Sequence, residues 1–263
     1  MSDSYYEHLF GVRDKVALVT GGTRGIGLMI AEGLVRCGAK VYVASRKVDA
    51  CEAAEAKLQE FGNCTAIPSD ISTVDGCKAL AAEIASRETA LHILVNNAGL
   101  TWSGNIDEFS EKAWDRVMDL DAKSPFFLAQ ALLPKLRAAA TPESRASIVN
   151  ISSVNGIRPS GLKNYSYVAA KAGLQALSAQ MARDLNADNI NVNVIAPGPF
   201  KSKMTAPLYA DEATEKEVMS RFTMGRWGAV EDVAGLTIFL SSKAGSFLTG
   251  VVIPCDGGST TIT

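Results

Sequence analysis

The sequence predicts an α/β fold in which helices cover both faces of a doubly wound parallel sheet. Two observations lead to this prediction. Short runs rich in Val and Ile recur along the 263 residues, and segments with helical periodicity separate them. Strands that are apolar on both faces are typical of parallel sheets, because helices cover such a sheet on either side. No repeat, low-complexity tract or Pro/Gly-rich linker divides the chain, so residues 1–263 are expected to form one domain.

The first half of the chain alternates strand and helix three times. "KVALVT" is an apolar run that ends at two glycines, and residues 25–37 have the period of a helix. "KVYVAS" leads to an expected helix over residues 50–61. "CTAIP" lies between Gly-Asn and a region of polar residues, and it leads to an expected helix over residues 76–87.

The second half supplies four more expected strands. They are "HILVNNAG", "ASIVNISS", "INVNVIAP" and "GVVIP", and the helices expected between them cover residues 111–138 and 167–187. Residues 197–227 are the least regular stretch, with three methionines among charged residues. This stretch is either a mobile cover over a site or a long surface loop.

Charge and composition exclude several classes of function. Lys and Arg (26) nearly balance Asp and Glu (28), for a net charge of -2, so the chain lacks the basic excess of proteins that bind nucleic acid. The five cysteines are scattered, without a CxxC pair or a neighbouring His cluster, and no metal site is expected. No apolar run has the length of a signal peptide or a membrane span, which predicts a soluble, cytoplasmic protein without a membrane partner.

A glycine-rich turn follows the first expected strand. "TGGTRGIG" places Gly21, Gly25 and Gly27 at the junction with a helix. Glycines permit a tight turn and close backbone approach, and a helix N-terminus offers free N–H groups to a pyrophosphate. The spacing departs from the commonest dinucleotide fingerprint, so a plain strand-to-helix turn is the alternative.

The end of the second expected strand indicates which dinucleotide binds. Ser45, Arg46 and Lys47 stand where an NAD site usually has an acidic residue for the ribose 2′-hydroxyl. An arginine there suits a 2′-phosphate, and Arg24 in the glycine turn is a second cation within reach. We therefore expect NADP(H) as the cofactor, the alternative being that these cations are solvated surface charges.

The stretch "YSYVAAK" at residues 165–171 contains two tyrosines and one lysine. A helix turns about 100° per residue, so Tyr167 and Lys171 share a face, whereas Tyr165 precedes the helix or points elsewhere. A free phenol ionises near pH ~10, and its use near neutrality requires about 4 kcal/mol, which one ammonium about 4 Å away supplies. Tyr167 assisted by Lys171 is thus a candidate acid or base. The alternative is helix packing plus a solvated charge.

Five motifs occur in order along the chain. The glycine turn is followed by "NNAG" at residues 96–99, "NISS" at 150–153, "YVAAK" at 167–171 and "APG" at 196–198. With them the sequence resembles the short-chain dehydrogenase/reductase family over about residues 13–258. The resemblance implies a nicotinamide-dependent oxidoreductase on one Rossmann-type domain. It also implies a homo-oligomer, a dimer or tetramer, and we expect a homotetramer.

The resemblance assigns catalytic roles by motif. Tyr167 would be the general acid that protonates a substrate carbonyl while hydride arrives, and Lys171 would assist it and bind the nicotinamide ribose. The serine is expected to be Ser153, because it directly precedes the short apolar residue and nearby glycine in "SVNG". Ser153 lies 14 residues before Tyr167, one more than the family's common spacing. Ser152 is the alternative, and it would point to the other face of the strand.

The same motifs imply further contacts to the cofactor. Asp70 and Ile71 would lie at the adenine ring and "NNAG" at the adenosine ribose, although Asn96 or Asn97 could mainly tie strands together. The "APG" region would approach the nicotinamide, with loop punctuation as the alternative. The cofactor residues implied in this way are Thr23, Ile26, Asp70, Ile71, Asn97, Ala98, Gly99, Tyr167, Lys171, Pro197, Gly198 and Ser202.

Two segments are similar to one branch of the family. "MGRWG" at residues 224–228 and "VIPCDGG" at 252–258 resemble 3-oxoacyl carrier-protein reductases, including the rhamnolipid-type ketoreductases. The implied substrate is a small-molecule ketone, 3-oxoacyl or polyketide-like and possibly bound to a carrier, in a pocket near Trp102, Phe200 and Met204. The alternatives are a sugar, gluconate or other secondary-alcohol dehydrogenase, or a non-redox sensor, isomerase or cyclase of the same fold.

One residue departs from the family pattern. An asparagine commonly lies 22 residues beyond the glycine of "NNAG", where it helps to hold a water beside the active lysine, and Asp121 occupies that position here. An ionised carboxylate would favour the charged form of Lys171 and also offset its field at Tyr167. Asp121 is therefore a fourth candidate catalytic residue. The alternative is that it bonds helix backbone while its main chain holds the water.

Overall fold

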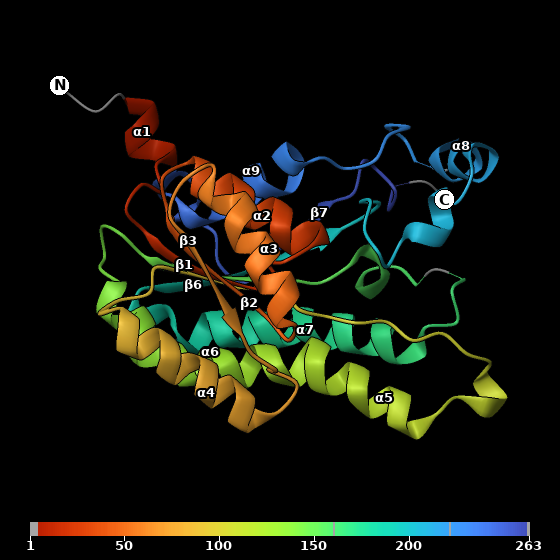
Figure 1. Cartoon of the computed structure of the whole chain (residues 1–263), viewed down its shortest axis with the longest axis horizontal. Helices are drawn as coiled ribbons and strands as arrows, with labels where there is room; N and C mark the ends of the chain where they lie inside the picture. The colour runs from red at the N-terminus through yellow and green to blue at the C-terminus, as the bar shows by residue number, and fades with distance from the viewer. Residues whose placement is uncertain (1–4, 160, 221, 262–263) are drawn as a thin grey trace.

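The structure is a computed structural model that describes residues 5–159, 161–220 and 222–261. In these ranges the chain forms a seven-stranded parallel sheet covered by helices (Figure 1). The doubly wound α/β fold and each of the expected strands are confirmed. The strands are β1 (Val16–Thr20), β2 (Lys40–Ser45), β3 (Cys64–Pro68), β4 (Ile93–Asn96), β5 (Ala146–Ile151), β6 (Ile190–Pro197) and β7 (Val252–Cys255).

The strand order in the sheet is β3-β2-β1-β4-β5-β6-β7. The chain first builds outward from β1 to β3, and then returns to pair β4 with the other side of β1, in a register that sets Ala17 opposite Ile93. The direction of winding therefore reverses between β1 and β4. In open parallel sheets, such a reversal leaves a crevice at the carboxyl ends of the strands, and ligands bind there.

Helices cover both faces of the sheet, as Figure 1 shows. Successive residues of β1 alternate between two cores: Leu18 packs with α4, α6 and α7, and Val19 packs with α2, α3 and α9. The α-helices are α1 (Tyr5–Phe10), α2 (Gly25–Arg36), α3 (Val48–Gln59), α4 (Val74–Arg87), α5 (Glu111–Met118), α6 (Ser124–Ala139), α7 (Tyr165–Asp184), α8 (Glu212–Ser220) and α9 (Val230–Ser241).

Short helical turns complete the described part of the chain. One of them, η2 (Asp119–Lys123), is a π-helical turn between α5 and α6. The others are 3₁₀ turns: η1 (Ile106–Glu108), η3 (Val154–Gly156), η4 (Asn186–Asp188), η5 (Ala206–Tyr209) and η6 (Lys243–Gly245).

The helix predicted over residues 111–138 is confirmed as α5, η2 and α6, but the π turn η2 interrupts its α-helical hydrogen bonding. The N–H of Ser124 bonds the carbonyl of Asp119, five residues back. The next residue, Pro125, has no N–H, so the α-helical bond to the carbonyl of Asp121 cannot form. Turns of this kind are frequent at functional sites. Here the turn contains Asp121, which is fully buried.

The start of α7 decides between the two readings of Tyr165. The expectation that it precedes the helix is wrong, since α7 begins at Tyr165 itself. Its ring nevertheless points away from Lys171: it packs edge-on against Phe109, with the ring centroids 5.5 Å apart, and remains 36% exposed. Tyr167, in contrast, is 9% exposed.

The irregular stretch over residues 197–227 contains η5 and α8. Its start is fixed by the hydroxyl of Tyr209, which donates to the carbonyl of Ser202 at 2.8 Å. Its end is fixed by the indole N–H of Trp227, which donates to Glu215 at 2.7 Å. Residues 202–204 border a cavity of about 380 Å³ that also contains the glycine turn. This placement supports the interpretation of the stretch as a cover rather than as a loop remote from the site.

Candidate active site

A cavity of about 380 Å³ lies at the carboxyl ends of β1, β2, β4 and β5, at the point where the winding reverses. Most residues that the sequence predicts for the site line this cavity. They are Gly21, Thr23, Arg24, Gly25, Ile26, Gly27, Ser45, Arg46, Asp70, Ile71, Asn97, Ala98, Gly99, Asp121, Tyr167, Lys171 and Ser202. Of the predicted catalytic and cofactor residues, four lie outside the lining: Lys47, Ser153, Pro197 and Gly198.

The glycine turn forms a cradle that side chains would fill. Gly21 and Gly25 have φ angles of 65° and 55°, in the left-handed region that favours glycine. A Cβ on Gly27 would lie 2.3 Å from Asn97 Nδ2 and 2.4 Å from the carbonyl oxygen of Gly21. The turn therefore leaves the N-terminus of α2 open to the cavity, and the residues present fit a dinucleotide pyrophosphate.

The two asparagines of "NNAG" have different tasks. Asn96 points into the protein and donates to Asn150 Oδ1 at 2.8 Å, so it ties β4 to β5. Asn97 lines the cavity, and its Nδ2 donates to the carbonyl of Thr20 at 2.8 Å. Asn97 thus holds the glycine turn in place as well as bordering the candidate cofactor site.

Two arginines that line the cavity have no carboxylate partner among the described residues. Arg24 precedes α2, Arg46 follows β2, and both are exposed and line the cavity. Neither forms an ion pair with any described residue. Lys47, which flanks the start of α3, is not part of the lining. The free guanidinium groups would match a ribose phosphate, since arginine bonds phosphate with a fork of N–H donors.

Tyr167 and Lys171, which also line the cavity, share a face of α7, as helix geometry predicts. Lys171 Nζ lies 5.6 Å from the centre of the Tyr167 ring. The ammonium is buried, donates to the carbonyl of Ile151 at 2.9 Å, and lies 3.1 Å from Asp121 Oδ2. Burial by itself opposes the charge, but the attraction of Asp121 and then of Tyr167 outweighs it and raises the pKa of Lys171. Lys171 is therefore a permanent cation near neutral pH.

Asp121 is an ion-pair partner of Lys171 and not a ligand of its own helix backbone. Its Oδ1 accepts the N–H of Leu100, in the loop after β4, at 2.8 Å. Burial raises the pKa of Asp121 against the opposing effects of Lys171 and this hydrogen bond. Of the two alternatives for Asp121, the structure supports the one in which the carboxylate interacts with the active lysine.

The two candidate serines have different partners. Ser152 lines the cavity, but its hydroxyl donates to the carbonyl of Lys171 at 2.9 Å and accepts from Gln175 at 3.0 Å. Its proton is therefore already engaged in a hydrogen bond. Among the described residues, the Ser153 hydroxyl only accepts a hydrogen bond, from the N–H of Asn155 at 3.2 Å, so its proton is left for another acceptor. Ser153 thus remains the better candidate to donate a hydrogen bond to a substrate.

Sequence reasoning missed several lining residues and misplaced one. Leu100 and Thr101 directly follow "NNAG", which was the signal that could have found them. Phe200, expected at the substrate pocket, is 2% exposed and packs on Gly228 inside the core, so that expectation is wrong. The other lining residues that the sequence did not predict for the site are Ala44, Ser69, Leu120, Ile151 and Lys203.

"APG" has a packing role that the sequence does not reveal. Gly198 follows β6, and a Cβ on it would lie 2.7 Å from both Cα and Cβ of Asp256. Its N–H donates to the carbonyl of Cys255 at 3.0 Å. The glycine therefore lets the end of β6 approach the segment after β7, outside the cavity lining.

Replacing Asp121 with Asn is expected to raise kcat for alcohol oxidation and to move the rise of activity with pH to lower pH. The isosteric amide removes a negative charge 3.1 Å from Lys171 Nζ, so the field of the ammonium at Tyr167 is no longer offset. The measurement is a pH–rate series on both proteins. Superimposable profiles would contradict the prediction, and so would a loss of activity at high pH, because that result would mean that Asp121 mainly keeps Lys171 protonated.

In the described ranges, no group of three or more His, Cys, Asp or Glu side chains is placed to hold a metal ion. None of the helices in those ranges is both long enough and apolar enough to cross a membrane.

Comparison with known proteins relates this geometry to characterised relatives. The family model described as enoyl-(acyl carrier protein) reductase matches residues 21–260. The rhamnolipids biosynthesis 3-oxoacyl-[acyl-carrier-protein] reductase of Pseudomonas aeruginosa is 43% identical over 95% of this chain and 97% of its own. Gluconate 5-dehydrogenase of Gluconobacter oxydans is 36% identical over 96% of this chain and 97% of its own. The solved RhlG/NADP active-site complex of Pseudomonas aeruginosa superimposes with a TM-score of 0.93, at 42% identity, over 96% and 98% of the two chains.

Proposed function

The chain belongs to the short-chain dehydrogenase/reductase family, and from this premise we propose that it is an NADPH-dependent reductase of 3-oxoacyl groups. The observation that carries the proposal is the buried Tyr167–Lys171 pair beside a glycine cradle with two unpaired arginines. We further propose that residues 1–263 act as one domain in a cytoplasmic homotetramer. The termini, residues 1–4 and 262–263, lie outside the described residues.

Tyr167, Lys171 and Ser153 have separate roles in the proposed reduction. When bound, NADPH supplies the hydride that adds to the carbonyl carbon. The Tyr167 hydroxyl donates its proton to the carbonyl oxygen, which becomes the hydroxyl of the product. The Lys171 ammonium stabilises the negative charge that this leaves on the phenol oxygen, and Ser153 donates a hydrogen bond to the substrate oxygen.

The cavity itself holds the cofactor through the groups that line it. The N–H groups at the start of α2 would bind the pyrophosphate, and Arg24 and Arg46 would bind the 2′-phosphate. Asp70 and Ile71 would border the adenine, and Ser202 would border the nicotinamide. Asn97 positions the glycine turn through its bond to Thr20.

Exposed apolar side chains on the loop that follows the cavity-lining Leu100 and Thr101, and on a second loop bonded to it, support an apolar substrate chain. The loop after β4 carries Trp102 and Ile106, and the loop before α7 carries Leu162, exposed at 48%, 71% and 52%. The two loops are joined, because the N–H of Gly104 donates to the carbonyl of Lys163 at 3.2 Å. A sugar acid would call for polar donors here, whereas an acyl chain gains from contact with exposed apolar side chains.

A substrate panel tests the proposal. Reduction of 3-oxoacyl thioesters of increasing chain length is followed by the loss of NADPH absorbance, and oxidation of gluconate with NADP⁺ is followed by its gain. We expect kcat/KM to rise with acyl length. A preference for gluconate would support the sugar dehydrogenase, and tight NADPH binding without turnover of any ketone would support a non-redox sensor.

A further inference from the structure

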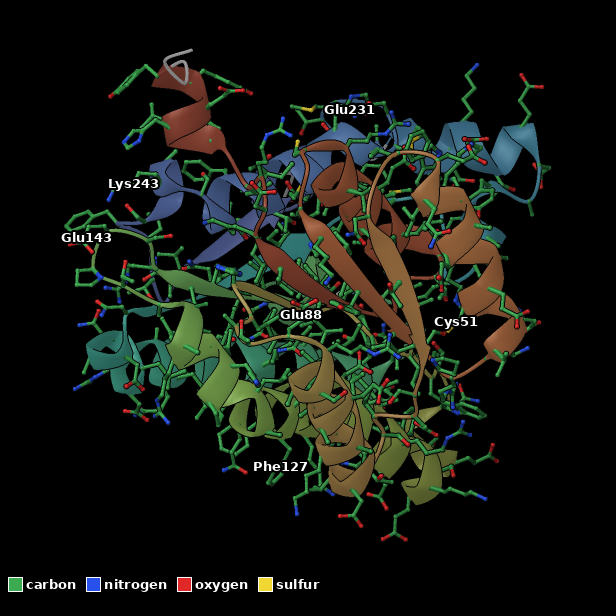
Figure 2. The ribbon with its side chains drawn as sticks, turned by 60° about the vertical axis from the view of Figure 1, so that its left-hand side comes forward. Cys51, Glu88, Phe127, Glu143, Glu231 and Lys243 are labelled. Atoms are coloured by element: carbon green, nitrogen blue, oxygen red, sulfur yellow. The ribbon has the colours of Figure 1, made fainter. Side chains whose placement is uncertain are left out.

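A second cavity, of about 220 Å³, opens at the opposite edge of the sheet. Its lining includes Lys15, which directly precedes β1, and Arg145, which directly precedes β5, so the cavity lies at the amino ends of the strands. We call it the amino-edge cavity. The loop before β5 and the turn η6 close one side of it, and Figure 2 shows Glu143 and Lys243 from these two segments next to each other. None of its lining residues belongs to the candidate active site.

Three cations meet at this cavity, and none of them has a carboxylate partner among the described residues. Lys15 Nζ donates to the carbonyl of Ser241 at 2.8 Å, and Lys243 Nζ donates to the carbonyl of Glu143 at 3.0 Å. The Arg145 guanidinium donates to asparagine side chains, among them Asn191 Oδ1 at 2.7 Å. No described carboxylate lies within ion-pair distance of any of the three. The cavity therefore concentrates positive charge that the described chain does not neutralise.

The cations keep N–H groups free for a ligand. An ammonium has three donors, and Lys15 and Lys243 each use one, for a main-chain carbonyl. Lys15 is not an ordinary solvated lysine, since burial lowers its pKa. The hydroxyl of Ser241, which is 3% exposed, has no hydrogen-bond partner among the described residues. Among the described lining residues the one acid is Glu143, an exposed residue whose main-chain carbonyl already accepts from Lys243.

We propose that the amino-edge cavity binds a small oxyanion, the phosphate group of inorganic phosphate or of an organic phosphate. Lys15 and Lys243 supply charge-assisted donors to the phosphate oxygens, and Arg145 adds positive potential from a fixed position. Through Lys15 and Ser241 the anion would bridge the start of β1 and the end of α9. Binding therefore stabilises the fold from the edge of the sheet opposite to the cofactor.

Thermal unfolding with and without phosphate tests this proposal. Saturating NADP⁺ is present throughout, so that Arg24 and Arg46 are already engaged, and sodium chloride keeps the ionic strength equal. A ligand at ten times its dissociation constant is expected to raise Tm by about 3 to 6 °C for a chain of this size. Inorganic phosphate and glycerol 3-phosphate are compared as probes. An equal shift with both indicates a site for free phosphate, and a larger shift with the ester indicates an organic phosphate.

Matched variants locate the site. Lys15→Gln/Lys243→Gln is expected to weaken phosphate binding at least about tenfold and so to reduce the shift to about 1 to 2 °C or less at the same phosphate concentration, whereas the control Lys57→Gln/Lys78→Gln, which removes two exposed lysines elsewhere, keeps the full shift. Lys243→Gln alone, at an exposed position, serves if the double variant does not fold, and it is expected to weaken binding severalfold. The proposal is overturned if the wild type shows no shift beyond sodium chloride, or if the lysine variants shift like the control.

Discussion

Replacing Tyr167 with Phe is expected to lower kcat by about 10²- to 10⁴-fold while NADPH binding is retained. The phenol is 9% exposed, lines the large cavity and shares a face of α7 with the Lys171 ammonium. Phe keeps the ring and its packing but has no proton to donate to the substrate oxygen. Steady-state turnover of a 3-oxoacyl thioester, together with an NADPH titration by fluorescence, separates the loss of chemistry from a loss of binding.

Tyr165→Phe is the matched control for this experiment. The Tyr165 ring belongs to the same helix but packs against Phe109, and it is not part of the cavity lining. Most of the activity should therefore remain. If the two substitutions caused equal losses, the assignment of the proton donor from the helix face would be wrong.

Replacing Arg46 with Ala is expected to raise the dissociation constant of NADPH by about 10- to 150-fold, which corresponds to about 1.5 to 3 kcal/mol for a lost charge-assisted contact. NADH, which lacks the 2′-phosphate, should bind the variant as it binds the wild type. The reason is that Arg46 lines the cavity and has no carboxylate partner among the described residues that would compete for its guanidinium.

The cofactor comparison needs two further measurements. Lys78→Ala removes an exposed cation from α4, away from the cavity, and should leave both affinities unchanged. The kcat/KM of the wild type with NADPH and with NADH is measured alongside. A wild type that uses NADH equally well or better would refute the assignment of Arg46 to the 2′-phosphate.

Local patterns in the sequence determined the framework. Apolar runs such as "KVALVT" predicted buried parallel strands, because a strand covered on both faces has no polar side. The turn requires glycines, because its φ angles are left-handed or a Cβ would clash with neighbouring atoms. The spacing of these glycines therefore predicted the turn by itself. The pairing of Tyr167 with Lys171 depended only on the helical repeat, which is a property of the backbone.

Only the tertiary structure decided the features that depend on residues far apart in the chain. The approach of Asp121 to Lys171, 50 positions later, depends on the π turn η2 and on the packing of α7 against it. The choice between Ser152 and Ser153 required the position of Gln175 on α7. The amino-edge cavity brings together the charges of Lys15 and Lys243, which are too far apart in the chain for any local pattern to connect them. Sequence patterns report short-range backbone preferences, whereas the balance of burial, charge and hydrogen bonding at a site is set by which distant side chains the fold brings together.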